Sequence, residues 1–231
     1  MPRRRRPWSE VLPGFAWDER MAGGRYRHVS SDGTLGKLVA ARDIASAVTD
    51  ISDRSARRFS DMAEAVVRGN ISAADFQEAM MGELKNLYGA TSALARGGYA
   101  NMTPAEWGRN GGILRKEYEY LADFAQALNN EELTVAQARA RAALYPGKAF
   151  SRYWDEDRRL KRAGGFTEER WRAVGDERTC TSTDGKTGCA ERHAMGWVPI
   201  GTHETSPGAG DTPCLGNCRC TLEYRNQTVG E

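Results

Sequence analysis

The stretch IASAVTDISDRSARRFSDMAEAV, residues 44–66, decides the fold class. Its apolar and small residues recur at intervals of three or four, at Ile44, Val48, Ile51, Ser55, Phe59, Met62 and Val66. That spacing places these side chains along one stripe of an α-helix. The sequence therefore predicts a long amphipathic helix that packs its stripe against other helices.

Capping residues predict further helices after this stretch. Gly69-Asn70 ends the first helix, and Ser72, followed by Asp75 at the third helical position, starts a second that runs to about Gly97-Gly98. A cap at Thr134 starts another helix, which stops before Pro146-Gly147. A short helix is also expected from Ser151 to Ala163, and no helical period continues after Trp171.

The helix expected after Thr103 has opposing signals for the position of its first residue. Thr103-Pro104 combines a capping hydroxyl with proline at the first helical position, and Glu106 supplies the carboxylate three residues after the cap. Three glycines follow within the first turns, which makes those turns costly. We therefore expect the firm helix to begin only near Ile113 and to end at Asn129-Asn130.

We predict a mainly α protein of three parts. The first is an extended basic N-terminal arm, residues 1–34, with at most a short strand around Tyr26 to Val29. The second is an α-helical domain of about four to five helices, residues 35–165. The third is a cysteine-rich C-terminal module, residues 166–231, with short β runs at Gly196–Ile200 and Cys218–Tyr224.

Composition excludes several classes of protein. A chain of 231 residues with 40% hydrophobic residues is long enough to bury its own core. A formal net charge of +2 argues against a coat on nucleic acid. Because no stretch approaches the ~20 apolar residues of a membrane helix, and the first residues lack the apolar run of a secretory signal, we expect a soluble protein without a membrane partner.

Five cysteines form the strongest chemical signal, and all of them lie within one C-terminal segment: Cys180, Cys189, Cys214, Cys218 and Cys220. The Leu-Gly-Asn spacer between Cys214 and Cys218 permits a knuckle that presents two thiolates to one Zn²⁺, and Cys180 with Cys189 supplies the other pair. Cys218 and Cys220 share a face in an extended segment, so either can complete the site and one is left over. Two disulfides plus a free thiol, or simply reduced cysteines, are the alternatives.

The histidines carry a weaker signal. His193 and His203 lie inside the same segment and could replace a thiolate as a metal ligand. For an enzyme, His203-Glu204 would offer a general base, and a cysteine of low pKa would offer a nucleophile. The chain has no second histidine at helical spacing, no Gly-x-Ser-x-Gly and no phosphate loop. We therefore favour ordinary histidines and predict that the protein is not an enzyme, with no catalytic residue assigned.

The two ends of the chain differ in net charge. Residues 1–30 carry seven arginines against three acidic side chains, and four of these arginines are consecutive: Arg3, Arg4, Arg5 and Arg6. With Trp8 they predict an arm that docks on a partner or neutralises the phosphates of DNA; a solvated tail is the alternative. Residues 171–231 carry six basic and eight acidic side chains, which argues against the alternative of a DNA-binding zinc module.

Two C-terminal motifs resemble a known family. The sequences Gly196–Thr202 (GWVPIGT) and Asn217–Tyr224 (NCRCTLEY) look like the closing module of tailed-phage head morphogenesis proteins, the Mu F-like minor head proteins. Residues 176–180 (DERTC) resemble the first half of that module. The family has a short Cys-x-x-Cys at the front, and here Thr183 stands where its second cysteine would be.

The resemblance covers about a quarter of the chain, and it implies a function. It predicts a minor capsid protein that is made in the cytoplasm of an infected bacterium and acts in head morphogenesis. It also implies that the protein is a structural component of the virion, in the head interior or at the portal vertex, with the portal and other head proteins as partners.

Overall fold

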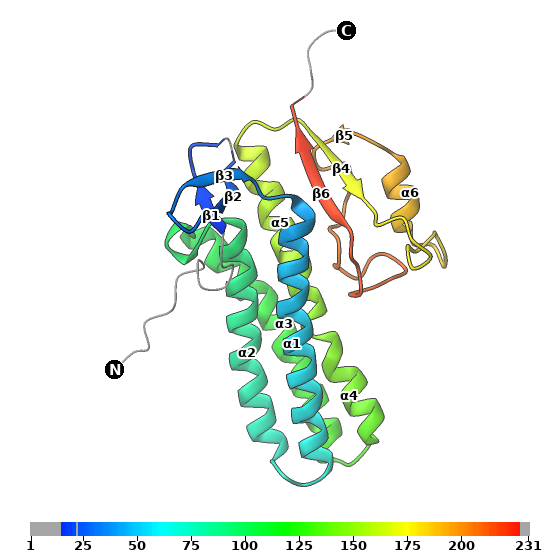
Figure 1. Ribbon diagram of the computed structural model, residues 1–231. Helices are drawn as coiled ribbons and strands as arrows, with labels where there is room; N and C mark the ends of the chain where they lie inside the picture. The colour runs from blue at the N-terminus through cyan, green and yellow to red at the C-terminus, as the bar shows by residue number, and fades with distance from the viewer. Residues whose placement is uncertain (1–14, 22, 227–231) are drawn as a thin grey trace.

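The computed structural model describes residues 15–21 and 23–226, and it is mainly α-helical, as the sequence predicts. Long helices form an elongated bundle, and two small sheets lie towards one end of it (Figure 1). The helices of the bundle are α1 (Ala41–Val67), α2 (Ala73–Ala95), α3 (Pro104–Asn129), α4 (Val135–Leu144) and α5 (Gly147–Ala163). Among the described residues, no helix is long and apolar enough to cross a membrane.

The periodic stripe predicted in α1 faces the core of the protein. Val48 and Phe59 on the stripe are fully buried, while Arg54 and Arg57 off the stripe are exposed. Ser72 starts α2 as predicted, because its hydroxyl accepts a hydrogen bond from the Asp75 N–H at 3.0 Å. A short 3₁₀ helix, η2 (Tyr99–Asn101), connects α2 to α3.

Helix α3 begins earlier than the sequence indicates. It starts at Pro104 rather than near Ile113, in spite of the exposed glycines of its first turns. The Glu106 carboxylate accepts hydrogen bonds from the Thr103 N–H at 2.6 Å and hydroxyl at 2.9 Å, and it also pairs with Arg96. The cap and the buried ion pair therefore offset the cost of the glycines.

The N-terminal segment differs from the extended arm that we expected. Residues 15–38 fold into an antiparallel sheet with the order β1-β2-β3, built from β1 (Phe15–Asp18), β2 (Arg25–Val29) and β3 (Leu35–Leu38). Only β2 coincides with the short strand predicted around Tyr26. The other two strands have four residues each, too few for a clear alternation.

This sheet packs on the helices of its own chain. The Tyr26 hydroxyl donates to the Leu94 carbonyl at 2.7 Å, and Lys161 Nζ donates to the carbonyls of Gly23 at 2.9 Å and Gly24 at 2.7 Å. The ring of Trp17 covers Gly97, where a Cβ would overlap the indole. Trp17 and Tyr26 therefore pack on helices of the same chain, whereas residues 30–34 are exposed. The arginines and Trp8 of the predicted arm lie outside the described residues.

The C-terminal module contains a second antiparallel sheet, with the order β5-β4-β6. Its strands are β4 (Glu168–Arg172), β5 (Val198–Pro199) and β6 (Thr221–Arg225), so the two predicted β runs are confirmed in shorter form. The central strand β4 and the short helix α6 (Cys189–Ala194) were not expected. One hydrophobic cluster joins this module to the N-terminal sheet and the helices; it includes Tyr26, Ile44, Leu94, Trp154, Trp171 and Leu222.

Candidate metal centre

Four short segments bring the five cysteines together. Cys180 lies in the loop after β4, and Cys189 begins α6. Cys214 and Cys218 lie at the two ends of a tight loop, which we call the knuckle (residues 214–218), and Cys220 immediately precedes β6. Cys189, Cys218 and Cys220 are buried, whereas the other two are half-buried.

The sulfur atoms have the spacing of metal ligands. Cys189 Sγ lies 3.7 Å from Cys214 Sγ and 3.8 Å from Cys218 Sγ. A disulfide would hold two sulfurs about 2.05 Å apart. Four sulfurs placed 2.3 Å from one Zn²⁺ in a tetrahedron would be about 3.8 Å apart. All five described cysteines are free, so the cluster has the geometry to bind a metal ion.

Cys189 is the centre of the cluster. Its sulfur belongs to two groups of three in which all ligand atoms lie within 4.8 Å of one another, one with Cys180 and Cys214 and the other with Cys218 and Cys220. The Cys189 N–H also donates to Cys180 Sγ at 3.3 Å. Cys189 is therefore the cysteine that the two groups share.

The knuckle is held in shape by its own hydrogen bonds. The Leu215 N–H donates to the Thr212 carbonyl at 2.9 Å, and the Asn217 N–H donates to the Cys214 carbonyl at 3.0 Å. Leu215 adopts φ +52°, a left-handed conformation that is uncommon for a branched side chain. The adjacent Gly216 faces Gly147 at the start of α5, where a Cβ added to Gly147 would lie 3.3 Å from the Gly216 Cα.

The pKa values of two thiols show what a cation would change. The neighbouring Cys189 thiol raises the pKa of Cys214 to about 11. The same neighbour, together with burial, raises the pKa of Cys220 to about 12. Both thiols stay protonated at neutral pH without a cation, so a metal that binds them must displace their protons. Neither has the low pKa typical of a reactive cysteine.

Ion pairs fix the loops that carry the cysteines. Arg219, inside the Cys218–Cys220 segment, donates two hydrogen bonds to the Asp176 carboxylate at 2.8 and 2.7 Å. These bonds join the loop that precedes Cys180 to the segment that precedes β6. The pairing also holds the pKa of Asp176 at about 2.

A buried carboxylate anchors the next loop. Glu169 on β4 is fully buried and pairs with Arg158 of α5 at 2.7 Å. Its other oxygen accepts hydrogen bonds from the backbone N–H groups of Gly201 at 3.0 Å and His203 at 3.2 Å. No local pattern in the sequence indicates this pair, because its two residues belong to different elements that only the fold brings together.

The two candidate histidines lie outside the thiol cluster. His193 Nδ1 is 3.1 Å from the Trp171 carbonyl oxygen. The His203 ring is 1% exposed and packs edge-on against the Trp171 indole, while Glu204 is exposed. Within residues 15–21 and 23–226, the groups of ligand atoms close enough to hold a metal contain cysteines alone.

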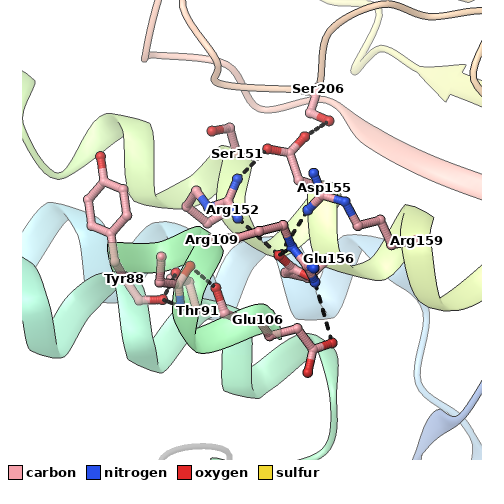
Figure 2. Close-up of polar contacts among 12 residues, drawn as sticks. Tyr88, Thr91, Glu106, Arg109, Ser151, Arg152, Asp155, Glu156, Arg159 and Ser206 are labelled. Atoms are coloured by element: carbon pink, nitrogen blue, oxygen red, sulfur yellow. Dashed lines mark hydrogen bonds and ion pairs between the residues drawn. The ribbon is translucent and has the colours of Figure 1, made fainter. Parts of the chain in front are cut away.

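A second polar network joins the helices to the module. Glu156 of α5, fully buried, accepts hydrogen bonds from Arg109 of α3 and from Arg152 and Arg159 of its own helix (Figure 2). The adjacent Asp155 accepts a hydrogen bond from the hydroxyl of Ser206, which belongs to the loop before the knuckle, at 2.5 Å. This network holds the module against α5.

No protein-family model, no curated protein and no solved structure matches this chain. Its class is therefore defined by its own fold and site. It is a mainly α protein whose C-terminal module gathers five free cysteines into a cluster that can bind a metal ion.

Proposed function

We propose that this chain is a structural protein of tailed-phage heads, a minor capsid protein associated with the portal, and that one Zn²⁺ closes its C-terminal module. The observation that carries the proposal is the thiol cluster. Cysteines from four segments converge within the module whose GWVPIGT and NCRCTLEY sequences resemble minor head proteins.

Zinc is favoured over other ways of closing the module. Residues 181–187, between Cys180 and Cys189, are all exposed, so this loop has little packing of its own and needs a further restraint. Thiolate ligands select soft or borderline ions, and a tetrahedral site of four thiolates is typical of structural Zn²⁺. Four of the five cysteines, Cys189 among them, would hold the ion.

The surroundings of the cluster support a charged metal–thiolate site. One Zn²⁺ with four thiolates carries a net charge of −2, and a cation nearby favours such a site. Arg219 lies between Cys218 and Cys220 in the chain, and Asp176 holds its guanidinium in place. Arg219 would therefore offset part of the charge.

The functional role follows from the resemblance together with this module. The protein would be made in the cytoplasm of the infected bacterium and incorporated into the head interior or the portal vertex. Its partners would be the portal and other head proteins, with packaged DNA as a further partner through Arg3, Arg4, Arg5 and Arg6. No step of this role requires turnover of a substrate.

The experiment is to measure the abundance of the chain in purified particles by quantitative mass spectrometry. We expect a low, constant copy number in finished heads and a defect in head assembly when the gene is deleted. Particles that never contain the protein, and that assemble, package DNA and infect normally without its gene, would contradict the assignment.

The contribution of the arginines is tested separately. If Arg3–Arg6 act through charge, replacing all four by alanine should reduce incorporation more at low salt than at high salt, because salt already screens the interaction. An equal reduction at both salt concentrations would exclude an electrostatic role. The matched control is Arg54→Ala with Arg57→Ala on exposed positions of α1.

A further inference from the structure

The cysteine cluster consists of two groups of three sulfur atoms that share one atom. We call Cys180, Cys189 and Cys214 the outer group, because two of its three residues are half-buried, and Cys189, Cys218 and Cys220 the inner group, because all three are buried. Within each group all the sulfurs lie within 4.8 Å of one another. Among the five described cysteines, no four sulfurs meet the same condition.

This arrangement matches two three-coordinate ions more closely than one tetrahedral ion. A single tetrahedral Zn²⁺ would have to draw a sulfur of one group towards the other group, and one of the five thiols would remain without a metal. Three thiolates in a plane at about 2.3 Å from one ion have their sulfurs about 4.0 Å apart. Cys189 Sγ lies 3.7 Å from Cys214 Sγ in the outer group and 3.8 Å from Cys218 Sγ in the inner group, which is close to that spacing.

The donor atoms of the two groups favour a soft monovalent ion. In the described part of the chain, no histidine and no carboxylate belongs to either group, so sulfur is the ligand atom throughout. Thiolates select Cu(I), Zn²⁺ and iron–sulfur clusters. Structural Zn²⁺ is almost always four-coordinate, and an iron–sulfur cluster is usually held by four cysteines. Cu(I) is readily held by three thiolates, so groups of three sulfurs favour Cu(I).

The shared sulfur is placed to bridge the two ions. Cys189 Sγ is the ligand atom that both groups contain, and the Cys189 residue is 1% exposed. A thiolate sulfur has more than one lone pair, so it can bind two Cu(I) ions at once. Two three-coordinate ions that share one thiolate need five thiolates, which is the number of cysteines in the cluster. No thiol is then left over.

We infer that the cluster also binds two Cu(I) ions, one in the outer group and one in the inner group, with the Cys189 sulfur as the bridge between them. Each of the five thiols loses its proton to solvent when the ions bind, and the oxidation state of copper does not change. The inference rests on the arrangement of the five sulfurs. It depends neither on zinc binding nor on the assignment to phage heads, so each of these can fail without the others.

The first test is the number of ions that bind. The full-length protein, as purified and kept reduced, is titrated without oxygen with the acetonitrile complex of Cu(I) and followed by native mass spectrometry. We expect two copper ions per chain and no thiol that iodoacetamide alkylates in the folded, loaded protein. A chain that binds only one Cu(I), or that keeps a reactive thiol after loading, would overturn the inference. The same titration with Zn²⁺ tests the zinc site separately, because it should give one ion and one reactive thiol.

The second test is the coordination of the bound copper. X-ray absorption at the copper edge of the loaded protein should show three sulfurs per copper and scattering from a neighbouring copper. Copper held by two sulfurs, without a copper neighbour, would indicate adventitious binding to pairs of thiols and would overturn the inference. In Cys189→Ser the number of sulfurs per copper should fall from three to two, and the copper neighbour should be lost. The control is Met195→Leu, which removes an exposed soft ligand at the end of α6 and should change neither result.

Two further variants keep the inference testable if Cys189→Ser does not fold. Cys180→Ser leaves the inner group complete, and Cys220→Ser leaves the outer group complete. Each variant should retain one copper with three sulfurs. Because the outer group has half-buried thiols, a Cu(I) chelator should remove that copper severalfold faster from Cys220→Ser than from Cys180→Ser. Equal rates of removal, or no copper with three sulfurs in either variant, would contradict the assignment of one ion to each group.

Discussion

The Glu169 carboxylate accepts a hydrogen bond from Arg158 Nε at 2.7 Å in the interior of the molecule. The two residues belong to β4 and α5, so this pair joins the C-terminal sheet to the helical bundle. Since the same carboxylate also bonds the backbone at Gly201 and His203, one side chain fixes the relative position of three segments.

We predict that Glu169→Ala lowers the free energy of unfolding by about 3–5 kcal/mol, because it leaves the Arg158 charge buried without its partner. The matched control is Glu168→Ala, one position earlier on β4. Its pair with Arg225 is partly exposed, and its loss should cost at most about 1 kcal/mol. The measurement is denaturant unfolding of both variants, and equal losses would contradict a special role for Glu169.

An alanine substitution at Gly97 tests whether Trp17 holds the N-terminal sheet on the helices. Gly97 and Gly69 have φ of +76° and +74°, so alanine strains the backbone similarly at both positions. Only at Gly97 would the new Cβ overlap the Trp17 ring, whereas at Gly69 it meets open space. Gly97→Ala should cost about 1–3 kcal/mol more than Gly69→Ala and expose the Trp17 segment to protease. Equal stability and equal proteolysis in the two variants would show that Trp17 does not hold the sheet.

Because of the Asp176–Arg219 pair, we predict that the stability of the fold depends on pH. Hydrogen bonds from Arg219 hold the pKa of Asp176 at about 2 in the folded protein, below its ordinary value of about 3.9 in an unfolded chain. The pair therefore stabilises the fold fully above about pH 4, and its contribution is lost as the pH falls towards 2. A carboxyl NMR titration of Asp176 should give a midpoint near 2, and Asp176→Asn should remove this dependence. A midpoint near 4 would mean that the pair does not form in solution.

The ligand set predicts different effects for the five cysteines. Because Cys189 Sγ lies close to the sulfurs of both groups, Cys189→Ser should abolish stoichiometric metal binding. A tetrahedral site needs only four ligands, so one of the other four cysteines is not a ligand. The variant with serine at that position should retain the full metal content. Measured zinc content of the five single variants checks this. Full retention in Cys189→Ser would contradict the central position of Cys189.

The helical part of the fold could be read from local patterns. The stripe of α1 and the cap at Ser72 depend on residues close in the chain, and the structure confirms both. The early start of α3 was missed, because the Arg96–Glu106 pair that supports it is a tertiary contact.

The β parts could be predicted only incompletely. Strand β4 has the sequence EERWR, which looks like an exposed charged segment. Its inward positions are Glu169 and Trp171, and the buried Glu169 is stabilised by groups from other segments, the Arg158 side chain and two backbone N–H groups. The N-terminal sheet depends in the same way on Lys161 and on Gly97, both distant in sequence.

The candidate site could be predicted in composition but not in arrangement. The spacing of Cys214 and Cys218 indicates a knuckle, and the structure brings all five cysteines into one cluster. Which cysteine is central was not visible, because it depends on how the segment that contains Cys189 packs against the knuckle. The Asp176–Arg219 pair that joins the loops spans 43 residues, a separation without a local pattern.

Native mass spectrometry of the purified full-length chain, with and without a chelator, shows directly whether zinc closes the C-terminal module. We predict one bound Zn²⁺ per chain and no disulfide. We also predict that the chelator removes the ion and makes the cysteines reactive towards alkylation without denaturant. A folded chain that binds no metal and either contains two disulfides or has all five thiols freely alkylated would contradict this prediction.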